Sequence, residues 1–358
     1  MPYLEINLKK IHHNAKVLKE ALNSKNISIM GVTKVILGNP TIAKKIVQAG
    51  ISYLGDSRIE NIIKMRKEGI NAHFILIRNP SLKEIPSVIK NSDISLNTEL
   101  FIIKKLSKES IRQNKKHGII LMVEMGDLRE GIMPKDLENI VDHVLKLKGV
   151  ELRGIGTNLK CFAGVIPDEK NMKAFSEIAE TIQDKKGINF EFVSGGNSAN
   201  FDWLMSTDNI GLINNLRLGT AILLGVGGIY ETPLPELYTD AFTFVAEIVE
   251  LKRKPLFPKG IITTNAFGEP SIFKNKKRFP DENRLRTQAL LNSGRQDILE
   301  TKLIPKEDTE IMSATSDYII VDLKDNENYK VGDELRFDIK YEALLHAMTS
   351  PFISKVFV

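Results

Sequence analysis

A lysine follows an apolar segment near the start of the chain, in Gly31-Val32-Thr33-Lys34. If residues 28–32 form a buried strand, Lys34 lies just past its carboxyl end. Loss of water lowers the pKa of an amine and makes it nucleophilic, so Lys34 is a candidate to form a Schiff base with a carbonyl compound. On position alone, the alternative is an ordinary surface lysine among the 50 Lys and Arg residues of the chain.

Two later segments are rich in small and hydroxyl-bearing residues. One reads Ser-Gly-Gly-Asn-Ser at residues 194–198, and the other reads Arg-Leu-Gly-Thr at residues 217–220. Small residues let backbone N–H groups approach an anion, and Ser198 and Thr220 add hydroxyl donors. The pair of segments therefore predicts a phosphate site, with tight turns that bind nothing as the alternative.

Short apolar segments alternate with segments of helical period between residues 28 and 218. The predicted strands cover residues 28–32, 51–54, 73–77, 94–96, 118–123, 152–156, 190–194 and 214–218. The predicted helices between them include 40–49, 58–68, 98–108, 136–147 and 169–185. Such alternation indicates parallel βαβ units, and eight strands close a (β/α)8 TIM-type barrel; an open doubly wound sheet is the alternative. Lys34 and both small-residue segments follow strands of this barrel, at the face where active sites lie.

The pattern changes after Tyr230, where residues 231–235 contain two prolines and predict a linker. Alternating or β-branched segments at 240–251, 317–322 and 334–339 predict a mostly β C-terminal domain. The N-terminal segment at residues 3–7 also alternates, and we expect it to join the C-terminal sheet. The predicted domains are therefore residues 1–7 with that sheet, 8–231 as the barrel, and 232–358 as the β domain.

Composition narrows the class of protein. The chain has 358 residues, 42% of them apolar and 27% charged, which is the balance of a globular protein. A net charge of +5 over this length is too small to indicate a nucleic-acid partner. The single cysteine cannot form an intrachain disulfide, and neither a signal core nor a membrane-spanning run is evident. We expect a cytoplasmic enzyme with no metal, membrane or nucleic-acid partner.

Several motifs, in order, resemble those of fold-type III enzymes that use pyridoxal 5′-phosphate. The lysine segment at residues 31–40, the segments 154–159 and 194–198, and the segment 215–219 fall where the alanine racemase family has its cofactor motifs. The opening residues 4–14 are also similar to that family. Within the family, segments 126–131 and 347–351 look most like the ornithine racemase branch. The resemblance covers nearly the whole chain.

The resemblance implies roles for individual residues. Lys34 would carry the cofactor and act as one catalytic base. The remaining cofactor-binding positions would be Arg129, Asn158, Asn197, Ser198, Arg217, Gly219 and Thr220. Among these, Ser198, Gly219 and Thr220, with the Asn197 turn, would hold the phosphate. Asn158 falls where alanine racemases usually place a histidine beside the ring. Arg129 falls near an arginine that orients the hydroxyl side of the cofactor.

Arg217 would face the pyridine nitrogen, and its chemistry favours simple proton exchange. An arginine, with a pKa above 12, does not accept the proton that a carboxylate would share with that nitrogen. A neutral pyridine stabilises an α-carbanion less, which discourages side reactions. The related decarboxylases have an acidic residue before the glycine where this chain has Arg217, so decarboxylation is disfavoured. For Arg217 and Asn158 the alternatives are a structural ion pair and a strand cap.

Racemisation needs a second proton carrier, on the opposite face of the α-carbon. Alanine racemases use a tyrosine from the partner subunit, but the best-matching stretch here, residues 263–268, offers Phe267. The candidates are Cys161, Tyr341 and His346. A thiol can serve if a neighbouring cation lowers its pKa, although a lone cysteine is more often a small buried apolar residue.

These observations predict an amino-acid racemase that acts as a homodimer on ornithine or another basic amino acid. Alanine racemase and a non-catalytic pyridoxal-phosphate homeostasis protein are the alternatives, and a barrel without a cofactor is a third. A substrate ammonium in a desolvated pocket needs a carboxylate partner. Asp127, Glu130 and Asp202 are the acids close to the predicted barrel mouth.

Overall fold

The computed structural model describes residues 1–273, 284–324, 326 and 328–358. They form two compact units. One unit is Leu8–Thr239, and the other combines Met1–Asn7 with Asp240–Val358. The first unit continues to residue 239, past the expected end at 231, because residues 231–235 are not a bare linker. They include β11 (Thr232–Pro233), which pairs with β10 (Val226–Gly227).

The first unit is a closed barrel of eight parallel strands, as predicted, and the open-sheet alternative is wrong. Each strand pairs with the next, and β9 pairs with β2 to close the ring. The strands are β2 (Ser28–Val32), β3 (Tyr53–Asp56), β4 (His73–Leu76), β5 (Ile94–Asn97), β6 (His117–Met122), β7 (Val150–Gly156), β8 (Phe192–Asn197) and β9 (Asn215–Leu218). The strand predicted at 190–194 is displaced, since β8 carries on through Gly195 and Gly196 to Asn197.

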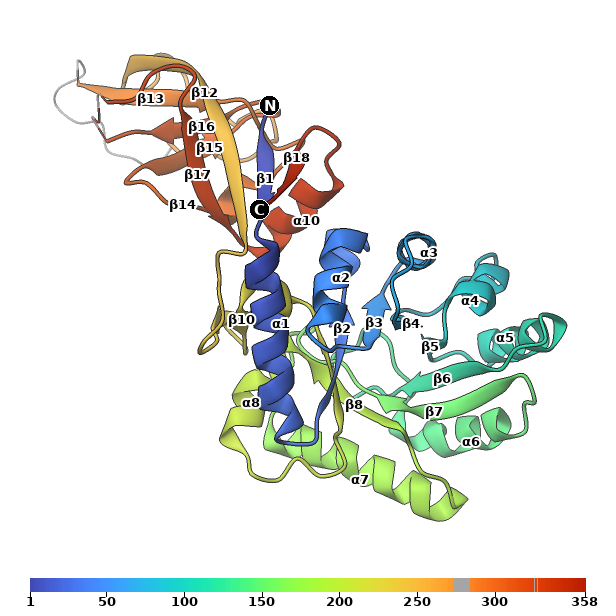
Figure 1. Cartoon of the computed structure of the whole chain (residues 1–358). Coiled ribbons are helices and arrows are strands. Elements are labelled where there is room, and N and C mark those ends of the chain that lie inside the picture. Colours follow the sequence, from blue (N-terminus) through green and yellow to red (C-terminus); the bar gives the residue numbers. More distant parts are fainter. Residues whose placement is uncertain (274–283, 325, 327) are drawn as a thin grey trace. The chain divides into compact units, whose positions relative to one another are not determined.

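Helices surround the barrel strands (Figure 1). They are α1 (Leu8–Asn23), α2 (Pro40–Gln48), α3 (Ile59–Lys67), α4 (Ile85–Asn91), α5 (Leu100–Arg112), α6 (Pro134–Leu145), α7 (Glu169–Lys186), α8 (Phe201–Ser206) and α9 (Thr220–Leu224). Local chemistry sets their ends. The Asn39 side chain accepts the amides of Thr41 and Ile42 at the start of α2. A capping box of Asp168 and Asn171 begins α7, whose last turn runs into Gly187 at φ 61°.

The interior of the barrel is filled by apolar side chains from several strands. Met30, Ile75, Ile94, Leu96, Ile120, Met122 and Phe192 form one buried cluster. The ring of Tyr53 packs edge-on against Phe192 at a centroid distance of 5.2 Å. This packing excludes water from the barrel interior. Polar side chains at the carboxyl ends of the strands therefore lie next to a closely packed apolar core.

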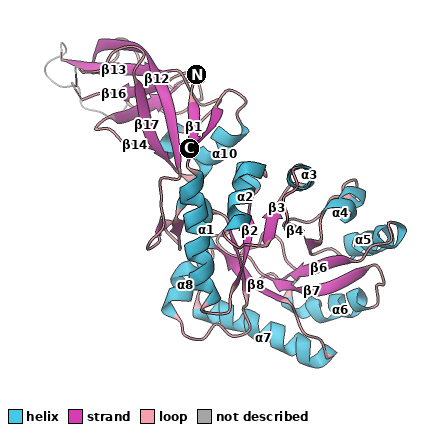
Figure 2. Cartoon of the chain, in the orientation of Figure 1, coloured by secondary structure: helices cyan, strands magenta, loops and turns pink. Residues whose placement is uncertain are grey.

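The second unit is mostly β, as predicted (Figure 2). Its main strands run in the order β14-β17-β12-β13-β16-β15. The strands are β12 (Phe242–Pro255), β13 (Leu285–Leu291), β14 (Leu303–Pro305), β15 (Glu310–Ala314), β16 (Ile319–Asp322), β17 (Glu334–Ile339) and β18 (Ser354–Phe357). It also contains α10 (Tyr341–Thr349), which the sequence patterns did not predict.

The N-terminal strand β1 (Tyr3–Ile6) belongs to this second sheet. It pairs antiparallel with β12, where Leu4 faces Phe244, and parallel with β18, where Leu4 faces Lys355. Leu4 and Ile6 are fully buried, whereas Tyr3 and Glu5 are partly exposed, which is the alternation that made this segment recognisable. The chain therefore begins in one unit, builds the barrel, and then returns.

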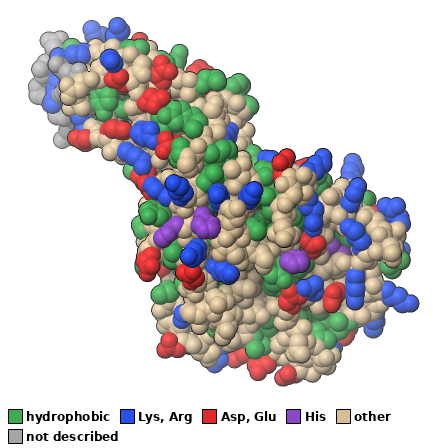
Figure 3. All heavy atoms as spheres, viewed as in Figure 1, with side chains coloured by type: hydrophobic (Ala, Val, Ile, Leu, Met, Phe, Trp, Pro, Cys, Tyr) green, Lys and Arg blue, Asp and Glu red, His purple; other side chains and the backbone are tan. Residues whose placement is uncertain are grey.

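Two general properties bear on function. In the part of the chain that the structure describes, no helix is long and apolar enough to cross a membrane. Within those same residues, no group of three or more His, Cys, Asp or Glu side chains is arranged to hold a metal ion. Figure 3 shows acidic and basic side chains interspersed on the visible face of the barrel unit.

Candidate active site

Lys34 begins the short 3-10 helix η1 (Lys34–Ile36), directly after β2. The residue before it is held firmly, because the hydroxyl of Thr33 donates a 2.7 Å hydrogen bond to Asp56 Oδ2 and its amide donates to Gly55 O. Asp56 ends β3, and its Oδ1 accepts the amide of Arg58 and Nδ2 of Asn61. Burial raises the pKa of Asp56, although these hydrogen bonds act in the opposite direction. The result is a fixed backbone beneath Lys34.

The electrostatic surroundings of Lys34 favour a neutral amine. The Lys34 side chain is exposed, and the protein atoms around its amine lower the pKa by partial desolvation. Cys161 and Asp56 act in the opposite direction, whereas the positive charges of Arg129 and Arg217 lower the pKa further. A lowered pKa increases the fraction of free amine at neutral pH, which a nucleophilic lysine needs.

Arg217 projects from β9 and is buried, with 6% of its surface exposed. Its Nη1 donates to the hydroxyl of Ser194 at 2.7 Å, and its Nη2 donates to Thr157 O at 2.6 Å and to Asn158 Oδ1 at 3.2 Å. All these acceptors are neutral, so the guanidinium charge is not cancelled by a carboxylate in direct contact. Burial lowers the pKa of Arg217 to about 10, which still leaves it protonated at neutral pH.

Two asparagines extend this network across the barrel end. Asn197 Nδ2 donates to Asn158 Oδ1 at 3.1 Å and to Leu159 O at 3.0 Å. Asn158 Oδ1 thus accepts from both Asn197 and Arg217. Its Nδ2 is shielded from solvent and has no acceptor among the described residues. An unsatisfied buried donor beside Arg217 is unfavourable in the protein alone and would be satisfied by a ligand acceptor.

Ser198, Gly219 and Thr220 lie at the starts of two short helices, after β8 and β9. Asn197 Oδ1 accepts the amide of Ala199, and Ser198 Oγ accepts the amide of Ala221 at 3.2 Å, which ties the two helix starts together. A Cβ at Gly219 would lie 3.3 Å from Cβ of Val32, the residue two before Lys34. First-turn amides of a helix lack partners within the helix, so this arrangement could hold a phosphate.

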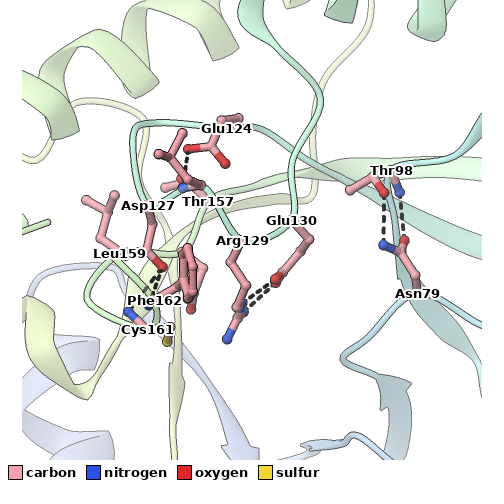
Figure 4. A network of polar contacts seen from close by, with 12 residues as sticks. Asn79, Thr98, Glu124, Asp127, Arg129, Glu130, Thr157, Leu159, Cys161 and Phe162 are labelled. Carbon is pink, nitrogen blue, oxygen red and sulfur yellow. Dashed lines mark hydrogen bonds and ion pairs between the residues drawn. The ribbon is translucent and has the colours of Figure 1, made fainter. Parts of the chain in front are cut away.

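The loops after β6 and β7 are joined at the barrel mouth (Figure 4). Asp127 is buried, and its Oδ2 accepts the amides of Cys161 at 3.1 Å and Phe162 at 3.0 Å. Asp127 Oδ1 is also buried and has no partner among the described residues. Arg129 binds both carboxylate oxygens of Glu130 through Nε and Nη2. Asp127 therefore fixes the backbone that carries Cys161.

The structure brings together the predicted site residues of the barrel. Cys161 Sγ lies 3.7 Å from Asn197 Nδ2, and its thiol is exposed, so the alternative of a buried apolar cysteine is wrong. The other two candidates for second base, Tyr341 and His346, lie on α10 in the other unit. Of the acids considered for a substrate ammonium, Glu130 binds Arg129 and Asp202 accepts the amide of Ile229.

Sequence reasoning gave no role to Asp56 and Ser194. Asp56 lies two residues after the strand predicted at 51–54, and the rule that active-site residues follow strands could have found it. Ser194 was visible only as part of a small-residue segment. Its hydroxyl accepts from Arg217 and donates to Asn215 Oδ1 at 2.7 Å, a link that depends on the register of β8 and β9.

Comparisons with known proteins show the family to which the chain belongs. Residues 6–225 match the model for the alanine racemase N-terminal domain. The chain is 37% identical to a lysine racemase of Thermotoga maritima, covering 99% of this chain and 98% of that protein. It is 36% identical to an ornithine racemase of Acetoanaerobium sticklandii, covering 99% of each.

Solved structures share the fold. An alanine racemase of Clostridium difficile superposes with a TM-score of 0.75 at 19% identity, covering 100% of this chain and 95% of that one. The alanine racemase of Bartonella henselae, solved with covalently bound pyridoxal phosphate, gives a TM-score of 0.74 at 17% identity, covering 100% and 99%. On the strength of the domain match and the full-length relatives, this chain belongs to the alanine racemase family.

Proposed function

We propose that this protein is a pyridoxal-phosphate-dependent racemase that interconverts the L and D forms of a basic amino acid, ornithine or lysine. The observation that carries this proposal is full-length similarity at 36–37% to a lysine racemase and an ornithine racemase. Relatives named alanine racemase are more distant, at 24% identity over 348 residues or 28% over 202 residues. Alanine is therefore the second candidate substrate.

The donor set at the barrel end fits a phosphate-bearing aromatic cofactor. Lys34 supplies an amine of lowered pKa that would hold the cofactor covalently. Ser198, Gly219 and Thr220 would hold the phosphate, because the hydrogen bond from the Ala221 amide to Ser198 Oγ brings the segments after β8 and β9 together. The unsatisfied Asn158 Nδ2, with Asn197 behind it, would bind an acceptor on the ring.

Arg217 would lie opposite the ring nitrogen and Arg129 near the hydroxyl side of the ring. When bound, pyridoxal phosphate withdraws electrons from the α-carbon of the amino acid and so acidifies the α-hydrogen. The protonated guanidinium of Arg217 offers hydrogen-bond donors but no acceptor, so it would not share a proton with the ring nitrogen. An arginine at this position would therefore favour proton exchange over reactions that need a longer-lived carbanion.

Two residues would move the proton. Nζ of Lys34 would remove or deliver the α-hydrogen on one face, and Sγ of Cys161 would do so on the other. Cys161 has three features that support this role: an exposed thiol, an amide fixed by Asp127, and a place near Lys34 and Arg217. The thiolate is the form of a cysteine that accepts a proton.

The same proposal includes a homodimer. In the alanine racemase family each site is completed by residues of the partner subunit, and this chain carries a full C-terminal unit of the kind that supplies them. A non-catalytic carrier of pyridoxal phosphate is disfavoured by that unit, since such proteins end near the end of the barrel. Sedimentation of the purified protein would report the dimer.

Incubation in heavy water tests the proposed function. The purified protein, loaded with pyridoxal phosphate, is given L-ornithine, L-lysine or L-alanine, and the products are separated on a chiral column. We expect deuterium at the α-carbon and the D enantiomer from ornithine or lysine, with a higher kcat/KM than for alanine. An alanine value at or above both others contradicts the substrate class. Absence of both exchange and D product from all three contradicts the racemase.

A further inference from the structure

The C-terminal unit contains a cavity whose lining includes none of the residues given a role in the proposed reaction. Its volume is about 400 Å³, within the range of small-molecule sites, and it lies among β14, β15 and the residues around 265–272 and 295–301. Its apolar lining includes Leu303, Pro305 and Ile311, and its polar lining includes Glu269, Arg295, Glu300 and Thr309. It is therefore a mixed cavity with apolar walls and a few polar groups.

A buried carboxylate in this cavity is only half satisfied. Glu300 is 2% exposed, and its Oε1 accepts from Arg295 Nη2 at 2.7 Å and Nε at 3.0 Å. Its Oε2 is shielded from bulk water and accepts no hydrogen bond from the described residues. The hydroxyl of Thr309, which is 8% exposed, is likewise without a partner there. A buried polar atom without a hydrogen bond destabilises the fold. Two such atoms belong to residues that line the same cavity, which indicates that a ligand supplies the hydrogen-bond donor.

The charge around the cavity specifies the sign of that partner. Arg295 Nη1 also binds Glu269 at 2.7 Å, so its single positive charge is shared between two carboxylates. Glu310 adds a third acid to the lining. Three carboxylates against one guanidinium leave excess negative charge, which attracts a cation and repels an anion.

We propose that this cavity binds a primary alkylammonium group. Glu300 Oε2 and Thr309 Oγ1 each have less than 1 Å² of accessible surface, so both side chains would turn toward the cavity to accept the ammonium. The methylene chain would lie against Leu303 and Ile311. An ammonium carries three donors and no acceptor, which matches one carboxylate oxygen and one hydroxyl. Burial of an ammonium is favourable only when a carboxylate pairs with it. The carboxylate of Glu300 is already buried, so its own desolvation has taken place on folding.

Two molecules carry this group: a basic amino acid through its side chain, and a free diamine. The first alternative rests on the proposed function and would make Glu300 a specificity residue. In the barrel unit, Glu130 already binds Arg129 and Asp202 accepts an amide. Asp127 holds two amides through Oδ2, and its Oδ1, like Glu300 Oε2, has no partner among the described residues. The experiment has to separate these two sources.

Calorimetric titration of the holoenzyme with 1,5-diaminopentane measures the site without reference to racemisation. Parent, Glu300→Gln, Thr309→Val and Glu310→Gln are compared. Glu300→Gln replaces the acceptor Oε2 with an NH₂ donor, so we expect the Kd to rise at least ~10-fold, as for a lost charged hydrogen bond. Thr309→Val should weaken binding by ~3-fold or more while leaving the Tm unchanged or higher, because the hydroxyl it removes has no partner. Glu310→Gln, an exposed acid, should change the Kd less than ~3-fold.

Steady-state kinetics of the same variants identifies the source of the ammonium. If Glu300→Gln raises KM for ornithine and lysine but not for alanine, the occupant is the substrate side chain. If it weakens only diamine binding, the occupant is a free diamine. If neither the diamine Kd nor the ornithine KM responds to Glu300→Gln in a variant that keeps the parent Tm, the proposal is overturned. Diamine binding that depends on Glu300 in a protein without racemase activity would instead refute the proposed function and leave this site standing.

Discussion

The buried guanidinium of Arg217 donates a 2.7 Å hydrogen bond to the hydroxyl of Ser194, so a neutral group holds this positive charge. The other acceptors, Thr157 O and Asn158 Oδ1, are neutral as well. Burial of an ion without a paired counterion costs several kcal/mol. The guanidinium of Arg217 therefore lowers the stability of the folded protein. Such an arrangement is typical of a site where the charge acts on a ligand.

Replacement of Arg217 by Glu should change reaction specificity. A carboxylate at this position would allow the ring nitrogen to share a proton and would stabilise the α-carbanion for longer. We expect the ratio of keto acid formed to D-amino acid formed to rise at least ~10-fold, measured by coupled assay and chiral chromatography. Arg217→Gln keeps an uncharged donor and should raise this ratio much less. Equal ratios in Arg217→Glu and the parent would show that Arg217 does not face the ring nitrogen.

Lys34→Ala should abolish racemisation, lowering kcat at least ~10³-fold, because a covalent catalyst and a proton carrier are lost together. In the parent, borohydride reduction followed by peptide mapping should place the cofactor on the peptide that contains Lys34. Lys44→Ala, an exposed lysine on α2, is the matched control and should retain the parent rate. A label on any other lysine would refute the assignment.

Cys161→Ala should separate proton exchange from racemisation. With only Lys34 active, deuterium should still enter one enantiomer with retention of configuration, while racemisation falls at least ~10²-fold. Mass spectrometry of the recovered substrate measures deuterium incorporation, and polarimetry measures racemisation. If Cys161→Ala racemises at the parent rate, the second proton comes from another residue, with Tyr341 and His346 as the next candidates.

Asp127→Ala should impair catalysis through the β7 loop rather than through loss of fold. It removes the acceptor of the Cys161 and Phe162 amides, which lie at the barrel mouth and not in the core. We expect kcat to fall at least ~10-fold with KM little changed, because misplacement of a catalytic group is costly. Iodoacetamide should also modify Cys161 at a different rate. Asp127→Asn keeps one acceptor oxygen and should retain a higher kcat than Asp127→Ala. Equal losses of kcat in the two variants would argue against the positioning role of Asp127.

His117 should make the barrel less stable in mild acid. It is buried, its Nε2 lies 2.8 Å from Ser95 Oγ, and burial lowers its pKa from 6.5 to about 4. Between these values the unfolded chain binds the proton and the folded protein does not, so stability falls as pH decreases from 6.5 to about 4. The loss approaches about 3 kcal/mol for the full shift.

Urea unfolding followed by circular dichroism at pH 7 and pH 4.5 measures this contribution. His117→Gln cannot take up the proton, so its stability should decrease less over this interval than that of the parent. His143→Gln, on the surface helix α6, is the control and should behave like the parent. A parent and His117→Gln with the same pH dependence would contradict the prediction.

The barrel was predictable because its strands are short segments with buried apolar residues, and most are followed by a helix of clear period. The sequence did not predict α4 and α8, which have 7 and 6 residues and are too short to show a helical period. The extent of β12 was also missed. It runs to Pro255 with a register shift between Ile248 and Glu250, and its outer half is polar and exposed.

The positions of the site residues were predictable, but their contacts were not. Lys34, Ser198 and Gly219 follow strands. The carboxyl ends of the strands in a parallel barrel lie at one face, even when the predicted strand bounds are wrong by a few residues. The neutral acceptors of Arg217 depend instead on the register between β8 and β9, which shifts between Ser194 and Asn197. A one-residue change of register reverses the direction of a side chain, and sequence periodicity does not fix such a shift.

The pairing of β1 with β12 and β18 governs the order in which the chain can mature on the ribosome. Residues 3–6 emerge before the barrel segment, yet their hydrogen-bonding partners lie at residues 242–245 and 354–357. At about 5–20 residues per second, β1 waits on the order of ten seconds or longer before a partner strand exists. The barrel, made entirely from the intervening segment, can close in that time. A strand that is synthesised before the barrel is therefore folded after it, and the second sheet is complete only when residue 357 has been made.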